Sequence, residues 1–525
     1  MATFDTIIVG AGSAGCVLAD RLSASGREVL LLEAGGSDDR QEVQIPAAFN
    51  KLFKGPVDWG YHTAPQRHLN GRRLYWPRGK MLGGCSSINA MIVQRGHPST
   101  YDAWAAQGNP GWSWEELLPY FKRSEHQERI QNAYHGVEGP LNVADLRDPN
   151  PLSRAFVAAA LELGHPHNDD FNDGQQEGFG LYQVSQKGGR RWSAADAYLK
   201  PALGRRNLHV ETHAHVTRLV IEGGRCRGVS FEQRGRQLTH HASQEVILCA
   251  GAIGSPQLLM LSGVGDEAHL RDVGVRVTHH LPGVGQNLQD HLAVMAAYAC
   301  TEPVSLEHAE TLPNVARYLL RGRGPLTSNV GEAGGFVRVD PELEAPDLQF
   351  HFGPAYFINH GFVEPGGAGF SIGPTLVQPY SRGRITLRGP SHRAHPHIEP
   401  NYLEDERDMH VLVEGLKLAR RIAHTRALAP YQGGETLPGA DARSDEDWRD
   451  HVRAYVETLY HPVGTCAMGQ TPEGGAVVDG ALRVHGVDGL RVVDASIMPT
   501  IINANTNVPT IAIAEKAADL IVYGG

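Results

Sequence analysis

The sequence has little that indicates a metal centre, a disulfide framework or an exported protein. Its six cysteines are scattered and form no C-x-x-C pair, which argues against a zinc ribbon and against disulfides and fits a reducing cytosol. No H-E-x-x-H or comparable ligand set appears, so we predict no metal, and we expect the histidines of "HRAHPH", residues 392–397, on a surface loop. The chain opens with no basic region followed by an apolar core, so export by a signal peptide is not expected.

Basic clusters and long apolar runs are also scarce. The formal net charge is −10, and no run of Lys and Arg is long enough to follow a phosphate backbone, which disfavours nucleic-acid binding. One charge-free segment, residues 246–265, has the length of a membrane span but contains several glycines and a proline. We predict instead a buried strand, a turn, and a helix that begins at Ser255-Pro256. The 525 residues leave room for two or three domains.

The N-terminal sequence "DTIIVGAGSAGCVLADRLSASGREVLLLEAGG" has the parts of a dinucleotide-binding unit in order. It predicts a strand, the turn Gly10-x-Gly12-x-x-Gly15, a helix, a second strand and Glu33. The glycines allow the backbone to approach a pyrophosphate at the helix N-terminus, where free N–H groups favour negative charge. Glu33 follows Gly15 by 18 residues, close to the spacing of about 20 for an acid that binds a ribose hydroxyl. The alternative is a glycine-rich turn without ligand, and the fingerprint alone does not separate NAD from FAD.

Five further motifs follow in order along nearly the whole chain. They are "PRGKMLGGCSSINAMIVQRG", "GAIGSPQLLMLSGVG", "YHPVGTCAMG", "LRVVDASIMPT" and "NANTNVPTIAIAEKAADLI". With these motifs the sequence resembles the glucose-methanol-choline (GMC) family of FAD-dependent oxidoreductases. Within the family it is most similar to the bacterial choline dehydrogenase and medium-chain alcohol dehydrogenase branch, through "VDWGYHTAPQ", "LNGRRLYWPRGK" and "GVGQNLQDH".

The resemblance implies an α/β fold, α+β overall, with two discontinuous domains. A doubly wound, Rossmann-like FAD-binding domain is expected from residues 1–150, 205–300 and 455–525. A substrate-binding domain built on an antiparallel sheet is expected from residues 151–204 and 301–454. Alternation of apolar residues in "DLQFHF" and "RITLRG" fits strands of that sheet.

The resemblance also implies which residues bind the cofactor. These are Gly10, Gly12, Ser13, Ala14, Gly15, Glu33, Ala34, Gly84, Asn89, Ala90, Met91, Val93, Val216, Ala250, Asp494, Ala495, Asn507, Pro509 and Thr510. For Asp494 the alternative is a helix or turn cap. Some family members tether FAD through a histidine at the position occupied here by Ile88, so we expect non-covalent FAD. Pro509 suits the first turn of a helix whose N-terminus would stabilise reduced flavin.

His461 and Asn505 are the expected catalytic residues. Pro462 favours an extended backbone at His461, so the imidazole projects from a stiff segment; a structural role in a turn is the alternative. In the family the matching histidine faces the flavin. A neutral imidazole there can accept the hydroxyl proton while hydride leaves the alcohol carbon. Asn505 matches the residue that holds the alcohol oxygen, although the asparagines of "NANTNVPT" could also simply shape a loop.

The resemblance implies oxidation of a primary alcohol to its aldehyde by hydride transfer to flavin N5, with electrons passed to a quinone or another acceptor. The alternatives are an oxidase that uses oxygen, a choline dehydrogenase, a non-redox hydroxynitrile lyase, and a nucleotide-binding protein without catalysis. Choline would require a carboxylate, for which Glu332 is a candidate, and an aromatic cage, which cannot be assembled from the sequence. An apolar pocket could be lined by Phe350, Phe352, Tyr356 and Phe357, but we expect these residues in the core. We expect a cytoplasmic protein, with peripheral contact to the inner face of the membrane left open, as is the oligomeric state.

Overall fold

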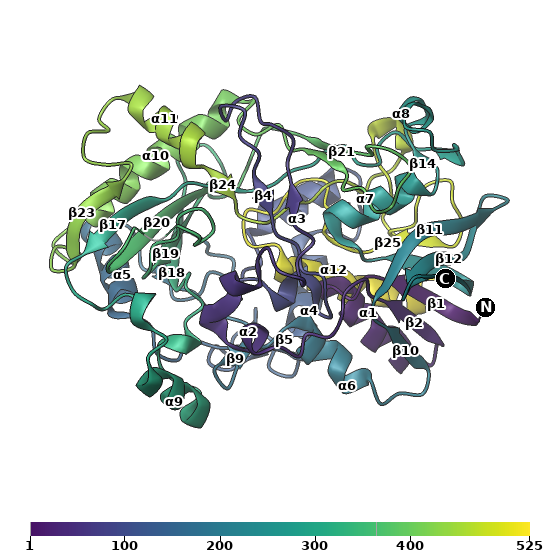
Figure 1. Cartoon of the computed structure of the whole chain (residues 1–525), viewed down its shortest axis with the longest axis horizontal. Coiled ribbons are helices and arrows are strands. Elements are labelled where there is room, and N and C mark those ends of the chain that lie inside the picture. Colours follow the sequence, from purple (N-terminus) through teal and green to yellow (C-terminus); the bar gives the residue numbers. More distant parts are fainter. Residues whose placement is uncertain (1, 364, 525) are drawn as a thin grey trace.

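The strands of the protein form two large sheets at opposite ends of the molecule (Figure 1). The computed structural model describes residues 2–363 and 365–524. The first sheet has seven strands in the order β10-β2-β1-β13-β12-β11, with β25 beside β13. They are β1 (Thr3–Val9), β2 (Val29–Leu32), β10 (Leu208–Glu211), β11 (Ala214–Glu222), β12 (Arg225–Gln233), β13 (Arg236–Leu248) and β25 (Leu490–Val492).

The first sheet is parallel in the part that carries the glycine-rich turn. Strands β10, β2, β1, β13 and β25 pair in parallel, whereas β11 and β12 continue the sheet as an antiparallel extension. Parallel strands are covered on both faces, which explains why "VLLL" of β2 is entirely buried. This arrangement confirms the expected α/β class with a Rossmann-like sheet.

The second sheet has eight strands, and its pairings are antiparallel. They are β7 (Gly178–Leu181), β16 (Leu292–Ala293), β17 (Ala296–Cys300), β18 (Ala333–Val337), β19 (Leu348–Gly353), β20 (Gly369–Leu376), β23 (Gln432–Leu437) and β24 (Glu457–Thr458). Helices α5 (Pro151–Glu162) and α10 (Glu406–Ala423) pack against it. The segment "DLQFHF" lies in β19, as predicted.

Two predicted elements differ in the structure. The segment "RITLRG" contributes β21 (Arg384–Thr386), but this strand pairs with β22 (His397–Glu399) in a separate small sheet. Helix α7 (Gly251–Leu261) begins four residues before the predicted start at Ser255, so Pro256 lies inside it. Pro256 cannot donate to the carbonyl of Ala252, and the Thr465 hydroxyl donates to that carbonyl instead, at 2.6 Å. A partner 213 residues away in the sequence thus makes the earlier helix start possible.

Some of the sequence ranges predicted for the FAD-binding domain contribute strands to both large sheets. The predicted domain boundaries therefore stay a prediction. Strands β16, β17 and β24 fall in stretches assigned to the FAD-binding domain, yet they pair within the eight-stranded sheet. None of the helices in the described residues combines the length and the apolar content needed to cross a membrane.

Helix α12 (Asn507–Val522) lies in the middle of the molecule and packs against α1 (Ser13–Ala24) and α4 (Trp114–Ser124) (Figure 1). Its Glu515 carboxylate is fully buried and accepts hydrogen bonds from Arg21 of α1, Arg123 of α4 and the Tyr198 hydroxyl. Charge-assisted hydrogen bonds of this kind are among the stronger polar interactions in proteins. One buried carboxylate therefore joins three helices that are distant in sequence.

We expect Glu515→Ala to lower the free energy of unfolding by about 3–5 kcal/mol, because it leaves two guanidinium groups without their buried partner. Denaturant unfolding followed by circular dichroism measures this change. The matched control is Glu446→Ala, which removes the exposed partner of Arg453 and should cost about 1 kcal/mol or less. Equal stability of the two variants would show that the three-helix contact does not depend on the carboxylate.

Candidate active site

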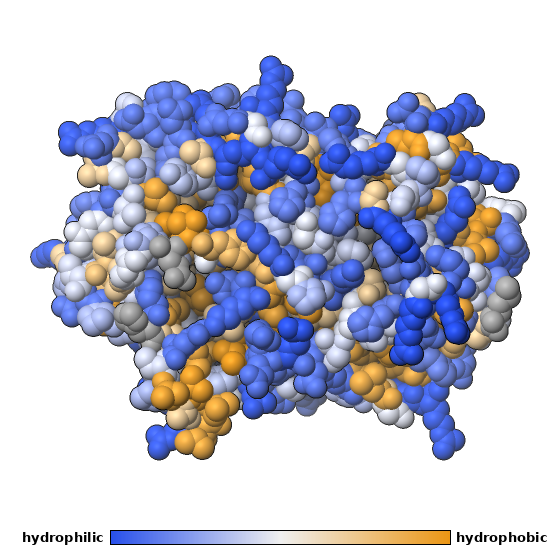
Figure 2. Space-filling model, viewed as in Figure 1, coloured by the Kyte–Doolittle hydropathy of each residue, from blue (hydrophilic) through white to orange (hydrophobic). Residues whose placement is uncertain are grey.

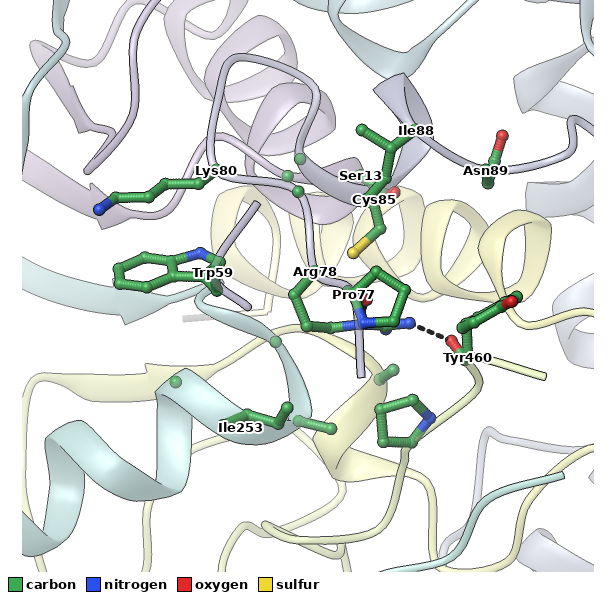
Figure 3. Close-up of a pocket in the computed structure, with 18 of the residues that line it drawn as sticks. Ser13, Trp59, Pro77, Arg78, Lys80, Cys85, Ile88, Asn89, Ile253 and Tyr460 are labelled. Atoms are coloured by element: carbon green, nitrogen blue, oxygen red, sulfur yellow. Dashed lines mark hydrogen bonds between the residues drawn. The ribbon is translucent and has the colours of Figure 1, made fainter. Parts of the chain in front are cut away.

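A cavity of about 540 Å³ is lined by residues of both large sheets and of the segments that connect them. Its wall includes the carboxyl ends of β1 and β2 and residues 351–353 of β19. Loops around residues 77–92 and 459–462 complete it, as the close-up shows for Pro77, Arg78, Ile88, Asn89 and Tyr460 (Figure 3). Ligands in open α/β sheets bind at the carboxyl ends of the strands, which is where this cavity lies.

Three helices begin at the cavity. The N-caps of α1, α7 and α12 are Gly12, Ala250 and Thr506, which all line the cavity and provide no side-chain cap. At the first turns of α1 and α12 the two helices are joined, because the Ser13 hydroxyl donates to the Asn507 side-chain oxygen at 2.6 Å. At α1 and α12, uncapped N–H groups and the helix dipoles favour an anion such as a pyrophosphate.

The glycines of the first turn permit contacts that no side chain allows. Gly10 has a φ of 101°, and a Cβ at Gly15 would lie 1.9 Å from the Gly10 carbonyl oxygen. In the second glycine-rich stretch, a Cβ at Gly84 would lie 2.7 Å from the Cα of Gly12. The two glycine-rich stretches therefore pack directly on each other, and they leave the backbone at the cavity wall free to approach a ligand. This cradle fits the dinucleotide part of FAD.

Glu33 lies at the end of β2, buried against the cavity wall. Its two carboxylate oxygens accept hydrogen bonds from the N–H groups of Ala11, at 2.9 Å, and Gly35, at 2.8 Å. Burial raises the pKa of Glu33, and these hydrogen bonds oppose the rise. A carboxylate has further lone pairs, so Glu33 can also accept from a ribose hydroxyl in the cavity.

Asp494 both caps a turn and lines the cavity. It accepts hydrogen bonds from the N–H of Gly251, the hydroxyl of Ser255 and the N–H of Ser496. Burial raises its pKa, and these donors oppose the rise. The turn cap considered as an alternative is thus present, and it holds Asp494 at the start of α7.

Most of the residues predicted to bind the cofactor line this cavity. They are Gly10, Gly12, Ser13, Ala14, Glu33, Ala34, Gly84, Asn89, Ala90, Met91, Val216, Ala250, Asp494, Ala495, Asn507 and Thr510. Gly15, Val93 and Pro509 are not part of its wall. Gly15 packs against Gly10, Pro509 is in the first turn of α12, and Val93 is buried and donates its N–H to the Gln183 carbonyl. These three can act on a ligand only through the shape of the backbone around it.

His461 and Asn505 meet at the cavity wall. The Nε2 atom of His461 lies 3.3 Å from the Asn505 amide nitrogen, and its Nδ1 atom lies 3.0 Å from Nδ1 of His291. Because the Asn505 amide nitrogen can only donate, Nε2 of His461 is the acceptor and Nδ1 carries the proton. The backbone N–H of His461 donates to Asp290 at 2.8 Å. The imidazole is thereby fixed in one tautomer, with its basic nitrogen beside Asn505.

The electrostatic surroundings keep His461 neutral. The loss of water around the ring, and the neighbouring His291, His351 and Arg78, hold the pKa of His461 well below its usual range. Burial lowers the pKa of His291 to about 3. Both imidazoles are therefore uncharged at neutral pH, and the Nε2 lone pair of His461, which accepts from Asn505 in this structure, is the one that can take a proton.

Asn505 is oriented by a chain of hydrogen bonds from the second sheet. The Gln349 amide of β19 donates to the Asn505 side-chain oxygen at 3.3 Å and to the Tyr182 hydroxyl at 3.1 Å. The Tyr182 hydroxyl in turn donates to the Phe350 carbonyl at 2.6 Å. With its oxygen occupied by Gln349, the Asn505 amide presents its nitrogen toward His461.

The segment before His461 is held in an unusual conformation. Tyr460 has a φ of 70°, in the left-handed region that only a few per cent of non-glycine residues adopt. The Arg78 guanidinium donates to the Tyr460 carbonyl, as the dashed line in Figure 3 shows. The Tyr460 hydroxyl bonds to Nδ1 of His360 at 2.7 Å. Arg78 and His360 thus fix the turn that directs His461 into the cavity.

The sequence did not identify the residues that support His461. Asp290 and His291 lie in the quoted segment "GVGQNLQDH", and His291 is 170 residues from His461. The adjacent Asp and His were the one feature of that segment that could have indicated a role in the site. Arg78 likewise lies in "LNGRRLYWPRGK". Their roles depend on contacts between distant segments, which spacing alone does not predict.

The structure places the residues that were considered for the substrate pocket. Glu332 does not line the cavity; its buried carboxylate accepts from the Asn150 N–H and from the hydroxyls of Ser153 and Ser328. Of the four aromatic residues considered for the wall, Phe352 and Phe357 line it, whereas Phe350 and Tyr356 do not. The "HRAHPH" segment is a loop up to His397, which begins β22, and its His392 and His395 line the cavity. Among the described residues no group of three or more His, Cys, Asp or Glu could hold a metal ion.

Comparison with known proteins gives matches over nearly the whole chain. Two family models described as GMC oxidoreductase match residues 4–293 and 379–514. The chain is 46% identical to alcohol dehydrogenase [acceptor] of Pseudomonas putida, over 99% of this chain and 96% of that protein. It is 45% identical to mitochondrial choline dehydrogenase of Homo sapiens, over 99% and 89%. The structure of formate oxidase from Aspergillus oryzae superposes with a TM-score of 0.93 at 27% identity, covering 99% and 98% of the two chains.

We expect Gly15→Ala to abolish FAD retention, because the added Cβ would collide with the Gly10 carbonyl and displace the first turn of α1. The measurement is the FAD released from the purified, denatured protein, per mole of chain. Gly204→Ala is the matched control, since no atom lies within 4 Å of a Cβ at that position. Full FAD content in the Gly15 variant would contradict the close packing of the two glycine positions.

Proposed function

Because the chain belongs to the GMC oxidoreductase family, we propose that it oxidises an uncharged primary alcohol to its aldehyde, with His461 as the base. FAD is its cofactor and, when bound, supplies the acceptor for the hydride that leaves the alcohol carbon. The observation that carries the proposal is the pair formed by His461 and Asn505, with 3.3 Å between an acceptor and a donor nitrogen at the cavity wall.

His461 takes the hydroxyl proton of the alcohol. Loss of hydride from the carbon leaves positive charge there unless the hydroxyl proton departs, and the neutral Nε2 atom is the acceptor for that proton. When Nε2 is protonated, the Nδ1–H of His461 still donates to His291. The ring therefore accepts the proton without rotating, and its backbone remains attached to Asp290.

Asn505 holds the alcohol oxygen. Its N–H donors lie beside Nε2 of His461, so one oxygen atom can accept from Asn505 and donate to His461. The donor becomes more effective as negative charge develops on the oxygen. Gln349 keeps the amide in this orientation by occupying its oxygen.

The charges around the cavity favour an uncharged alcohol over choline. The carboxylates in its wall are Glu33 and Asp494, and both already accept backbone hydrogen bonds at the nucleotide-binding end. Arg78, which lies close enough to His461 to lower its pKa, adds positive charge there. Among the described residues, no carboxylate of the wall at the His461 end would face a quaternary ammonium, whereas Phe357 and other apolar side chains suit an aliphatic or aromatic substrate.

The electron acceptor and the cellular location belong to the same proposal. We expect electrons to pass to a quinone or another acceptor in a cytoplasmic enzyme, and contact with the inner face of the membrane stays open. Use of oxygen is the alternative for the acceptor, and choline oxidation and cyanohydrin cleavage are the alternatives for the reaction. The oligomeric state stays open.

We expect aliphatic or aromatic primary alcohols to bleach the oxidised-flavin absorbance under anaerobic conditions, and choline to bleach it far more slowly.

His461→Ala should retain FAD but reduce the bleaching rate by about 10²–10⁴-fold, because the proton acceptor is lost. The control is His410→Ala, on the exposed side of α10, with an unchanged rate. Undiminished bleaching in the His461 variant would refute the base; no bleaching of the FAD-loaded wild type by any alcohol would favour the lyase.

We expect Asn505→Ala to lower the rate of bleaching at saturating alcohol by about 10²–10³-fold, because the donor to the developing alkoxide is removed. Rapid-mixing absorbance measurements give this rate separately from the affinity for alcohol. FAD content should stay at the wild-type level. A variant that changes only the affinity would assign Asn505 to substrate binding, and unchanged kinetics would reduce it to a loop-forming residue.

A further inference from the structure

Helix α9 (Leu312–Arg321) exposes its apolar face to solvent. Leu312, Leu319 and Leu320 are 85%, 68% and 83% exposed, and Ala316 is exposed between them. The spacing of these four residues is i, i+4, i+7 and i+8, which is the pattern of an amphipathic stripe that normally faces a core. Figure 2 shows the result as a hydrophobic patch at the lower left, where α9 lies in Figure 1. We call Leu312, Ala316, Leu319 and Leu320 the α9 stripe.

The orientation of α9 is fixed by its other face. The buried Tyr318 packs with Leu326 and Ala309, against partly buried residues that include Ile45 and Ala47. The Tyr318 hydroxyl donates to the Gln44 carbonyl at 3.1 Å. The helix therefore cannot roll to bury the stripe without breaking these contacts. Exposure of the stripe is built into the fold.

Positive charge borders the stripe. The segment from Leu312 to Gly324 contains Arg317, Arg321 and Arg323 and no Asp or Glu. Arg317 and Arg323 share a single carboxylate, that of Asp148, at 3.4 and 3.5 Å. Among the described residues Arg321 is in no ion pair. The surface thus combines exposed leucines with an excess of guanidinium groups, although the whole chain carries a net charge of −10.

We propose that α9 docks the enzyme on an anionic phospholipid membrane, with the α9 stripe in the acyl boundary and the arginines at the headgroups. Helices with leucines on one face and basic residues on the other lie in the membrane interface in this way. Each basic residue near an anionic surface adds to the attraction. A second protein chain fits less well, because a stable interface buries roughly 800 Å² per partner and this stripe is four side chains on a ten-residue helix.

The position of α9 gives the contact a consequence for the cavity. Ala47, which packs beneath α9, belongs to η1 (Pro46–Leu52), and Phe49 of the same element lines the cavity together with Phe53. Docking through the stripe would therefore place this wall of the cavity near the bilayer. An apolar alcohol dissolved in the membrane would have a short path to the site. This consequence rests on the proposed function, whereas docking itself does not.

The test is flotation of the FAD-loaded enzyme with vesicles of phosphatidylglycerol and phosphatidylcholine, compared with vesicles of phosphatidylcholine alone. We expect the wild type to float with the anionic vesicles. Leu319→Ser/Leu320→Ser should reduce binding by about tenfold or more through lost apolar burial. Arg321→Glu should reduce it on anionic vesicles alone. The control Leu161→Ser/Leu163→Ser changes leucines that are 38% and 40% exposed at the end of α5 and should bind as the wild type does.

Two results would overturn the proposal. One is a wild-type enzyme that stays unbound with both kinds of vesicle, or a leucine double variant that floats as well as the wild type. The other is a wild-type dimer, seen by light scattering, that the double variant converts to monomers, since the stripe would then be covered by a second copy. Bleaching of the flavin by soluble alcohols, measured in parallel, should be the same in the wild type and all these variants. Failure of the proposed reaction would appear in that measurement and not in flotation.

Discussion

The active site depends on one buried carboxylate, Asp290. It accepts hydrogen bonds from the hydroxyls of Tyr402 and Thr458 and from the backbone N–H of His461. Burial raises the pKa of Asp290 to about 6, and these donors oppose the rise. These three hydrogen bonds offset the cost of burying the group, and their donors come from two segments of the chain, one at Tyr402 and one at Thr458 and His461. The catalytic histidine of our proposal is therefore positioned first by its backbone and then by His291.

At the nucleotide-binding end of the cavity, segments that are distant in sequence are also held together, here by close backbone packing. The glycine-rich turns bring the starts of α1 and α12 together, and the Ser13–Asn507 hydrogen bond joins them. In the middle of α12, Glu515 ties the helix to α1 and α4. A helix that contributes to the cavity at its first turn is thus anchored about two turns later. Preorganisation of this kind reduces the entropy lost when a ligand binds.

Local patterns in the sequence predicted local structure well. The order of strand, glycine turn, helix, strand and Glu33 is present in the fold because each part depends on neighbouring residues. Predictions failed where distant residues decide the outcome. Thr465 allows α7 to begin before Pro256, and Ser153 and Ser328 draw Glu332 away from the cavity. The support of His461 by His291 and the exposure of the α9 stripe could not be predicted either, because both depend on tertiary packing.

The assembly of the seven-stranded sheet has a consequence for how the enzyme is made. Strands β1 and β2 are complete within the first 32 residues, but β25 at Leu490–Val492 and helix α12 come from the other end of the sequence. During synthesis the N-terminal glycine turn therefore leaves the ribosome long before the residues that close the cavity around it. The edge of β13 must wait for β25, its late partner, and contacts over such sequence separations form slowly. Insertion of the flavin is accordingly a late step of biogenesis, and until then the nascent chain is a natural client for chaperones.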